Sequence, residues 1–309
     1  MRPGSTAATG LVALALLLAI HVPFSAAAVE ISIIARFAPE AGNIADVAVM
    51  ANNHLALLYP AEGRIADYSM NGLLNQHIIR EGGVEARFKP VACSSGPNDM
   101  LYVYDEASSS VYTIGSDGNI HKGVNLVYPL AEGGATVLSR IGDLWVDATG
   151  SIWSLLPDRG VLAAFGADGN FVSQLNLLTK VGDPLATFSR AQFAADGSLF
   201  VLDYHQGAVF RIHPAADEIN RIVLSNPQEV DALPQVQDFA VDPGVNVLMA
   251  TYDSDRPLVL LVPDGDKFRL HPISLDLPPD AGRLACKYSG GKYIIWSRES
   301  PFLVVLQLR

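Results

Sequence analysis

Hydrophobic and polar positions follow one repeating pattern along most of the chain. Three copies are clearest, at residues 143–156, 190–203 and 238–251, and each consists of an apolar strand, a tight turn and a second apolar strand. The glycines in their turns are spaced 47 residues apart: Gly150, Gly197 and Gly244. That spacing is close to the about 40–50 residues of one blade of a β-propeller. The pattern therefore predicts a repeated β-hairpin unit.

Weaker copies at residues 46–59, 90–105 and 283–296 raise the number to six. Most copies contain a second turn of the Asn-Gly or Asp-Gly type, at residues 71–72, 117–118, 168–169 and 264–265. Such pairs between apolar runs indicate hairpins, because glycine adopts positive φ without steric cost. Each copy thus predicts four strands, as at 144–148, 151–156, 161–165 and 170–175. No helix is expected, and residues 181–187 and 226–234 are predicted loops between blades.

The two ends of the chain complement each other. The sixth copy ends after the apolar run 302–308 without an outer strand, whereas residues 29–37 (VEISIIARF) form a strand pattern with no hairpin partner. Pairing the two would remove an open sheet edge. We therefore predict an all-β fold, a six-bladed β-propeller closed by an N-terminal strand, as a single domain over residues 29–309.

The repeat resembles a known group of propellers. Its motif is an apolar strand, Asp-Gly, a second apolar strand and Asp, as in residues 196–203 (DGSLFVLD). The whole chain after residue 28 resembles the NHL-type six-bladed propellers and, more distantly, the gluconolactonase and strictosidine-synthase-like propellers. This resemblance implies an architecture, and fold does not carry function with it.

The first 28 residues differ from the repeats. Arg2 precedes an apolar stretch at residues 11–20, and small residues follow up to Ala28. This order is typical of a signal peptide, so we expect cleavage after Ala28 and a secreted or periplasmic protein with no membrane anchor. A retained anchor is the alternative, which His21 and Pro23 disfavour.

Charge narrows the range of partners. The 309-residue chain has 32 acidic and 21 basic residues and a net charge of −11, a balance that repels nucleic-acid backbones. We expect no nucleic-acid partner, a monomer, and a protein or a small polar ligand as the binding partner.

The register of the repeats predicts six residues at the mouth of the central channel of the propeller. Each lies just before an inner strand, and their signs alternate in blade order: Asp46, Lys89, Asp143, Arg190, Asp238 and Arg283. These charges either pair with one another and stabilise the mouth, or they bind a polar ligand or a metal ion. The alignment of Lys89 is ambiguous, and Pro90 is the alternative there.

Two enzyme classes are alternatives to a binding module. The likeness to gluconolactonase implies acidic metal ligands, which would be Asp46, Asp143 and Asp238, and hence a metal-dependent lactonase or related hydrolase with a divalent cation. Arg190 and Arg283 depart from that pattern, because positive charge disfavours a cation. We therefore favour a non-catalytic binding module and leave the question of an enzyme open.

The histidine, cysteine and aromatic residues do not predict a further binding or catalytic site. The propeller of peptide-amidating lyases is similar and holds zinc with histidines, but here the histidines have no metal-ligand spacing: His54, His77, His121, His205, His213 and His271. Cys93 and Cys286 lie in apolar runs of non-adjacent blades, which disfavours a disulfide. Six aromatic residues are predicted to pack between blades rather than to form a sugar-binding platform: Tyr102, Tyr104, Trp145, Trp153, Phe200 and Tyr252.

Overall fold

The computed structural model describes residues 30–50, 52–78, 88–121, 123–213, 218–222 and 234–308. The predicted signal peptide and most of the predicted loop at 226–234 lie outside these residues. Within the described part of the chain, no helix has the length and hydropathy needed to cross a membrane.

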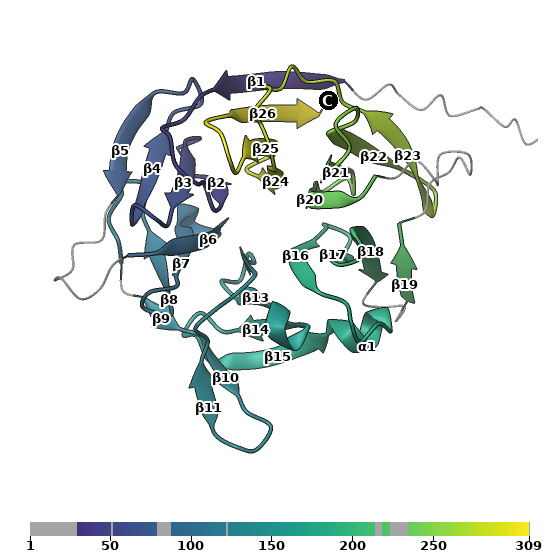
Figure 1. The fold of residues 1–309 in the computed structure, drawn as a ribbon. Helices are drawn as coiled ribbons and strands as arrows, with labels where there is room; N and C mark the ends of the chain where they lie inside the picture. Colours follow the sequence, from purple (N-terminus) through teal and green to yellow (C-terminus); the bar gives the residue numbers. More distant parts are fainter. Residues whose placement is uncertain are drawn as a thin grey trace, which may run out of the picture.

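Six four-stranded antiparallel sheets surround a central axis (Figure 1). The inner strands are β2 (Val47–Val49), β6 (Pro90–Ser95), β12 (Asp143–Val146), β16 (Phe188–Phe193), β20 (Val236–Val241) and β24 (Leu284–Ser289). The second strands are β3 (Leu55–Tyr59), β7 (Leu101–Asp105), β13 (Ile152–Leu156), β17 (Leu199–Asp203), β21 (Val247–Thr251) and β25 (Lys292–Ser297). The third strands are β4 (Arg64–Tyr68), β8 (Ser110–Ile114), β14 (Val161–Phe165), β18 (Ala208–His213), β22 (Leu258–Asp264) and β26 (Leu303–Leu308). The outer strands are β5 (Leu74–Ile78), β9 (Val124–Asn125), β15 (Phe171–Asn176), β19 (Glu218–Arg221), β23 (Lys267–Pro272) and β1 (Ile31–Phe37). We number the blades 1 to 6 in the order of their inner strands.

The second strands form the centre of each blade. Every residue of β3 and of β17 is buried, because strands inside a propeller pack on both faces against the neighbouring blades. Continuous apolar runs are the sequence signature of strands buried on both faces. The turns between them use glycine in the left-handed region, for example Gly169 and Gly197 with φ of 81° and 80°, as the Asp-Gly pairs predict.

The N-terminal strand closes the ring, as predicted. β1 pairs antiparallel with β26, from Ile31 opposite Leu308 to Phe37 opposite Leu303. Figure 1 shows the two strands side by side although they come from opposite ends of the chain. The last blade therefore contains β24, β25, β26 and β1, and β1 covers the edge of β26.

Two features differ from the sequence prediction. A short helix, α1 (Leu177–Val181), follows β15, where we expected none. Asn176 caps it by accepting the Thr179 backbone N–H at 2.9 Å, and Gly182 ends it with φ of 71°. Blade 3 is also preceded by a small hairpin, β10 (Val127–Pro129) with β11 (Ala135–Val137), which projects from the ring in Figure 1.

Candidate functional site

One level of the inner strands carries most of the charge in the channel. Four of the predicted residues, Asp46, Asp143, Arg190 and Asp238, lie at this level and are buried. Strand register places alanines at the same level in the other two blades, Ala92 opposite Tyr104 and Ala285 opposite Trp296. The predicted ring of six charged residues therefore has gaps in blades 2 and 6.

The other two predicted residues lie outside this level, which corrects the predicted register. Lys89 pairs with Glu106. The Arg283 Nε lies 3.8 Å from a Glu299 carboxylate oxygen, and both side chains are exposed. In blade 6 the turn is a two-residue Gly290-Gly291 loop, with Ser289 opposite Lys292. β24 consequently runs two residues further than the repeat indicated.

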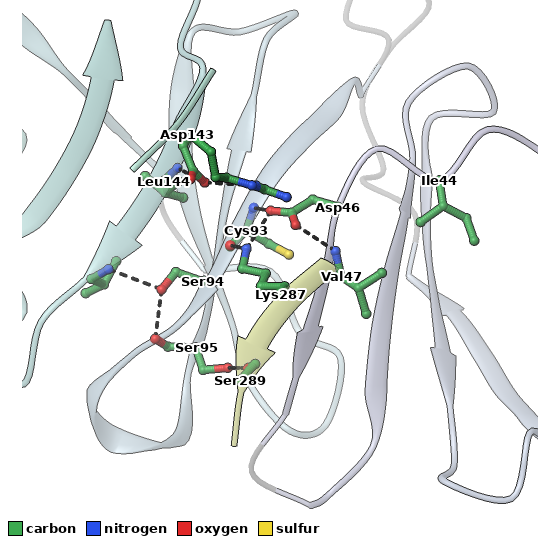
Figure 2. Close-up of polar contacts among 12 residues, drawn as sticks. Ile44, Asp46, Val47, Cys93, Ser94, Ser95, Asp143, Leu144, Lys287 and Ser289 are labelled. Carbon is green, nitrogen blue, oxygen red and sulfur yellow. Dashed lines mark hydrogen bonds and ion pairs between the residues drawn. The ribbon is translucent and has the colours of Figure 1, made fainter. Parts of the chain in front are cut away.

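Arg190 joins two carboxylates from different blades. Its Nε and Nη2 donate to Asp238 at 2.9 and 3.0 Å, and its Nη1 donates to Asp143 Oδ1 at 3.2 Å. The third carboxylate, Asp46, accepts from Lys287 Nζ at 2.7 Å. Lys287 lies two residues beyond the ring level, and it also donates to the Cys93 carbonyl (Figure 2). Three acids and two bases thus form one buried ionic layer.

The three aspartates also join each odd-numbered blade to the next blade. Each carboxylate accepts the N–H of the residue that follows it, at 2.9 Å in every case. Each also accepts a backbone N–H from the next inner strand, at 2.8, 3.3 and 3.3 Å from Cys93, Ala191 and Cys286 respectively. These bonds recur with threefold symmetry around the axis.

The even-numbered blades are joined onward by uncharged side chains. Ser94 Oγ accepts from Val146 N at 3.1 Å, and Ser289 Oγ accepts from Val49 N at 2.9 Å. Between blades 4 and 5, Gln192 bonds both the N–H and the carbonyl of Val241, at 3.0 and 2.7 Å. All six junctions between inner strands are therefore crossed by side-chain to backbone hydrogen bonds.

Burial and pairing act against each other on the pKa values of the layer. Burial tends to raise the pKa of Asp46, but Lys287 and Arg190 hold it below its ordinary value. For Asp143 burial prevails, and its pKa is raised despite the charge of Arg190. The carboxylates raise the pKa of Arg190 and of Lys287 against the effect of burial, so both bases stay protonated.

The two cysteines face the same layer but are unreactive. Cys93 and Cys286 are buried free thiols, and burial raises the pKa of both well above the ordinary value. Because the thiolate is the nucleophile, neither side chain supplies one at neutral pH.

The aspartates do not fit a divalent cation. A hard cation such as Ca²⁺ needs about 6–8 oxygen ligands. Each carboxylate here already accepts from backbone N–H groups and from Arg190 or Lys287. Across the described residues, no group of three or more His, Cys, Asp or Glu side chains is arranged to hold a metal ion.

A cavity of about 320 Å³ opens at the N-terminal ends of the inner strands, and we call it the N-side cavity. Asp46, Arg190 and Asp238 lie at its floor, and Arg283 and Arg298 also line it. Two tyrosines complete the wall: Tyr252 donates to the Tyr204 hydroxyl at 3.3 Å, and the two residues are 42% and 44% exposed. The prediction that Tyr252 packs between blades is thus wrong.

Sequence reasoning missed Lys287, Tyr204 and Arg298, although the repeat holds a signal for two of them. Tyr204, Tyr252 and Arg298 each directly follow the second strand of their blade. Counting one residue past each second strand would have found this wall. Lys287 has no such signal, because its side chain reaches to the ring level from a position further along β24.

A larger cavity, of about 460 Å³, opens at the C-terminal ends of the inner strands, and we call it the C-side cavity. Trp145, Phe193 and Tyr288 line it together with Gln192 and Lys287. Arg190 lines both cavities, so the ionic layer lies between them.

Comparison with known proteins relates this chain to others by structure alone. No protein-family model matches the sequence, and no curated protein matches it. A streptogramin B lyase structure superposes with a TM-score of 0.60 at 9% identity, covering 91% of this chain and 98% of the other. A gluconolactonase from Xanthomonas campestris gives 0.59 at 16% identity and 88% coverage of each chain. A protein of unknown function from Bacteroides thetaiotaomicron gives 0.58 at 14% identity, covering 91% and 76%. The chain is therefore a six-bladed β-propeller that is structurally similar to lyases, to a lactonase and to proteins without a known function.

Proposed function

We propose that this protein is an exported, non-catalytic binding module that takes a small polar ligand in the N-side cavity. The observation that carries the proposal is that the charged groups at the floor of this cavity are already paired with one another. Its carboxylates and bases are consumed in ion pairs and inter-blade bonds. A floor of this kind is rigid and supplies neither a free nucleophile nor an open set of metal ligands.

The rim of this cavity contains hydrogen-bond donors that are available to a ligand. Within the described residues, the guanidiniums of Arg283 and Arg298 make no hydrogen bond, and they form ion pairs only at 3.8 and 3.7 Å. Their side chains are 63% and 45% exposed. A guanidinium binds carboxylate and phosphate oxygens through paired N–H groups. The rim and the two tyrosine hydroxyls therefore favour a ligand with an anionic group.

The similarity to a lactonase does not transfer its chemistry. At 16% identity the likeness supports the fold alone. The three aspartates that would hold a cation under the lactonase hypothesis each serve an inter-blade bond instead. The donor set thus supports binding without catalysis.

Ligand binding can be tested with small anions on the purified protein. We expect citrate, gluconate or inorganic phosphate to raise the melting temperature and to give a calorimetric binding signal. The double variant Arg283→Gln/Arg298→Gln should weaken binding about tenfold or more, or about 1.4 kcal/mol. Lys89→Gln is the matched control, because it also removes an exposed charge but one that does not line the cavity.

Two outcomes would overturn the binding proposal. One is that none of these anions binds, or that the double variant binds as the parent does. The other is lactone hydrolysis that requires Ca²⁺ or Zn²⁺ and disappears in Asp143→Ala. Export is tested separately by N-terminal sequencing of protein from a culture medium or periplasmic extract, which should begin at Val29.

A further inference from the structure

We propose that the C-side cavity is a carbohydrate site in which the indole of Trp145 stacks on one face of a sugar ring. This cavity lies on the other side of the ionic layer from the N-side cavity. The proposal therefore does not depend on the function proposed above. Its volume of about 460 Å³ lies within the about 300–1,000 Å³ of small-molecule sites.

Blade packing does not require a tryptophan at position 145. Trp145 lies two residues after Asp143, and the corresponding residues after Asp46 and Asp238 are Ala48 and Ala240, both fully buried. Blades 1 and 5 thus pack with a methyl group where blade 3 has an indole. The indole is only partly buried and faces the cavity.

The indole of Trp145 is held in place by a cluster of aromatic rings. Trp145 stacks on Phe193 with ring centroids 4.7 Å apart, and Trp153 meets the edge of Phe193 at 5.1 Å. The Trp153 N–H donates to Asp147 at 3.2 Å, whereas that of Trp145 has no partner among the described residues. Trp145 therefore offers a fixed apolar face and a free polar edge, which suits a ligand with both kinds of surface.

The polar groups around the cavity match a neutral, hydroxylated ligand. Two acids and two bases line it, Asp143, Asp242, Arg190 and Lys287, so their formal charges cancel. Lys287 uses two of its three ammonium protons on Asp46 and Cys93. Within the described chain the Tyr288 hydroxyl makes no hydrogen bond, and burial raises its pKa, so it remains a donor. A charged ligand would gain little here.

A sugar ring combines the required properties. One face of a pyranose presents C–H groups, whose partial positive charge is attracted to the negative face of an indole. Its hydroxyl oxygens can accept from the Trp145 N–H and the Lys287 ammonium group, and its hydroxyl groups can also donate to the Tyr288 hydroxyl. A flat aromatic ligand would use the indole face but leave these polar groups unsatisfied.

The test is titration of the purified protein with methyl glucoside, methyl galactoside, N-acetylglucosamine and their disaccharides. We expect at least one to bind at millimolar concentrations or below and to change tryptophan fluorescence. Trp145→Ala should weaken that binding about tenfold or more, and Trp145→Phe should keep most of it. Tyr288→Phe should cost a smaller, several-fold factor.

Controls separate stacking from a general loss of structure. Trp153→Phe perturbs the support of the aromatic cluster but not the cavity lining, so it should weaken sugar binding less than Trp145→Ala does. The Arg283→Gln/Arg298→Gln variant should also bind sugars normally, which distinguishes this site from the N-side cavity. Far-UV circular dichroism and melting curves confirm that Trp145→Ala is folded, as Ala48 and Ala240 lead us to expect.

Three results would overturn the proposal. The first is that no sugar binds at millimolar concentrations. The second is sugar binding with the same affinity in Trp145→Ala and Trp145→Phe as in the parent. The third is binding of indole or benzyl alcohol that depends on Trp145 while every sugar fails.

Discussion

Arg190 is the most connected side chain of the channel, because its single guanidinium satisfies carboxylates from the two blades on either side of its own. Taking charges out of water costs several kcal/mol per ion, which close pairing and additional hydrogen bonds must offset. Here the offset comes from four backbone N–H groups of the surrounding chain and from Arg190 itself. The layer therefore specifies how the blades meet rather than adding much net stability.

Replacing Arg190 should for this reason destabilise the folded protein strongly. Arg190→Met leaves Asp143 buried without an ion-pair partner and leaves Asp238 with only the Arg298 guanidinium at 3.7 Å, and we expect a loss of about 3–5 kcal/mol in the free energy of unfolding. The matched control is Arg269→Met, whose exposed pair with Asp264 has the same 3.2 Å separation as the Arg190 pair with Asp143. It should cost no more than about 1 kcal/mol. Equal losses in urea denaturation would refute the structural role of Arg190.

Asp46 should make stability depend on acid pH. Its pKa in the folded protein is lowered from an unfolded value near 3.9, so the unfolded state binds the proton more tightly. The stabilisation is complete above that unfolded value and is lost as pH falls through the folded pKa. We expect the stability difference between the parent and Asp46→Asn to be largest at neutral pH and to shrink in the acid range. Urea denaturation at several pH values measures it, and a constant difference would contradict this assignment.

At the level of single residues, the sequence predicted four residues of the ring and offered pairing among the charges as one of two interpretations, but it did not predict which residues pair. Asp46, Asp143, Arg190 and Asp238 followed from spacing, because their blades share one turn length. Blade 6 did not, since Gly290-Gly291 shortens its turn and moves Arg283 away from the ring level. The reach of the Lys287 side chain to Asp46 depends on three-dimensional proximity that no spacing encodes.

At the level of elements, one hairpin turn makes a contact in addition to reversing the chain direction. The backbone carbonyl of Gly169 accepts from Val127 N at 2.9 Å, so the outer turn of blade 3 holds the segment that arrives from blade 2. The strand pattern predicted these turns well, since apolar runs separated by Asn-Gly or Asp-Gly pairs are local signals. Helix α1 and the β10–β11 hairpin were missed because they lie between repeats and have no counterpart in the other copies.

A comparison of two glycines distinguishes the effect of a left-handed backbone conformation from the effect of a close contact. Gly169 and Gly197 have nearly equal φ, but a Cβ at Gly169 would lie 2.1 Å from the Asn125 carbonyl oxygen, whereas one at Gly197 meets nothing within 4 Å. Gly197→Ala should therefore cost only the strain of a left-handed residue, about 1–2 kcal/mol. Gly169→Ala should cost clearly more, because backbone must move. Denaturant midpoints of the two variants decide this, and equal midpoints would show that the contact at Asn125 is not tight.

At the level of the whole molecule, closure by β1 is the feature that joins the two ends of the chain in one blade and completes the ring. β1 and β26 pair along six positions between Ile31 and Phe37. Phe37 also packs on Tyr68 of blade 1, with ring centroids 5.4 Å apart. Without β1, the edge of β26 and one side of blade 1 would face water. The sequence predicted this closure because both ends of the chain lacked a partner.

Closure is tested most directly by comparing equilibrium unfolding of a chain starting at Val29 with that of a chain starting at Ala38. We expect the longer chain to unfold in one cooperative transition. The shortened chain should be unfolded, or should unfold at a much lower denaturant concentration, because an open ring exposes apolar surface in blades 6 and 1. An unchanged midpoint and slope for the shortened chain would contradict the closed ring.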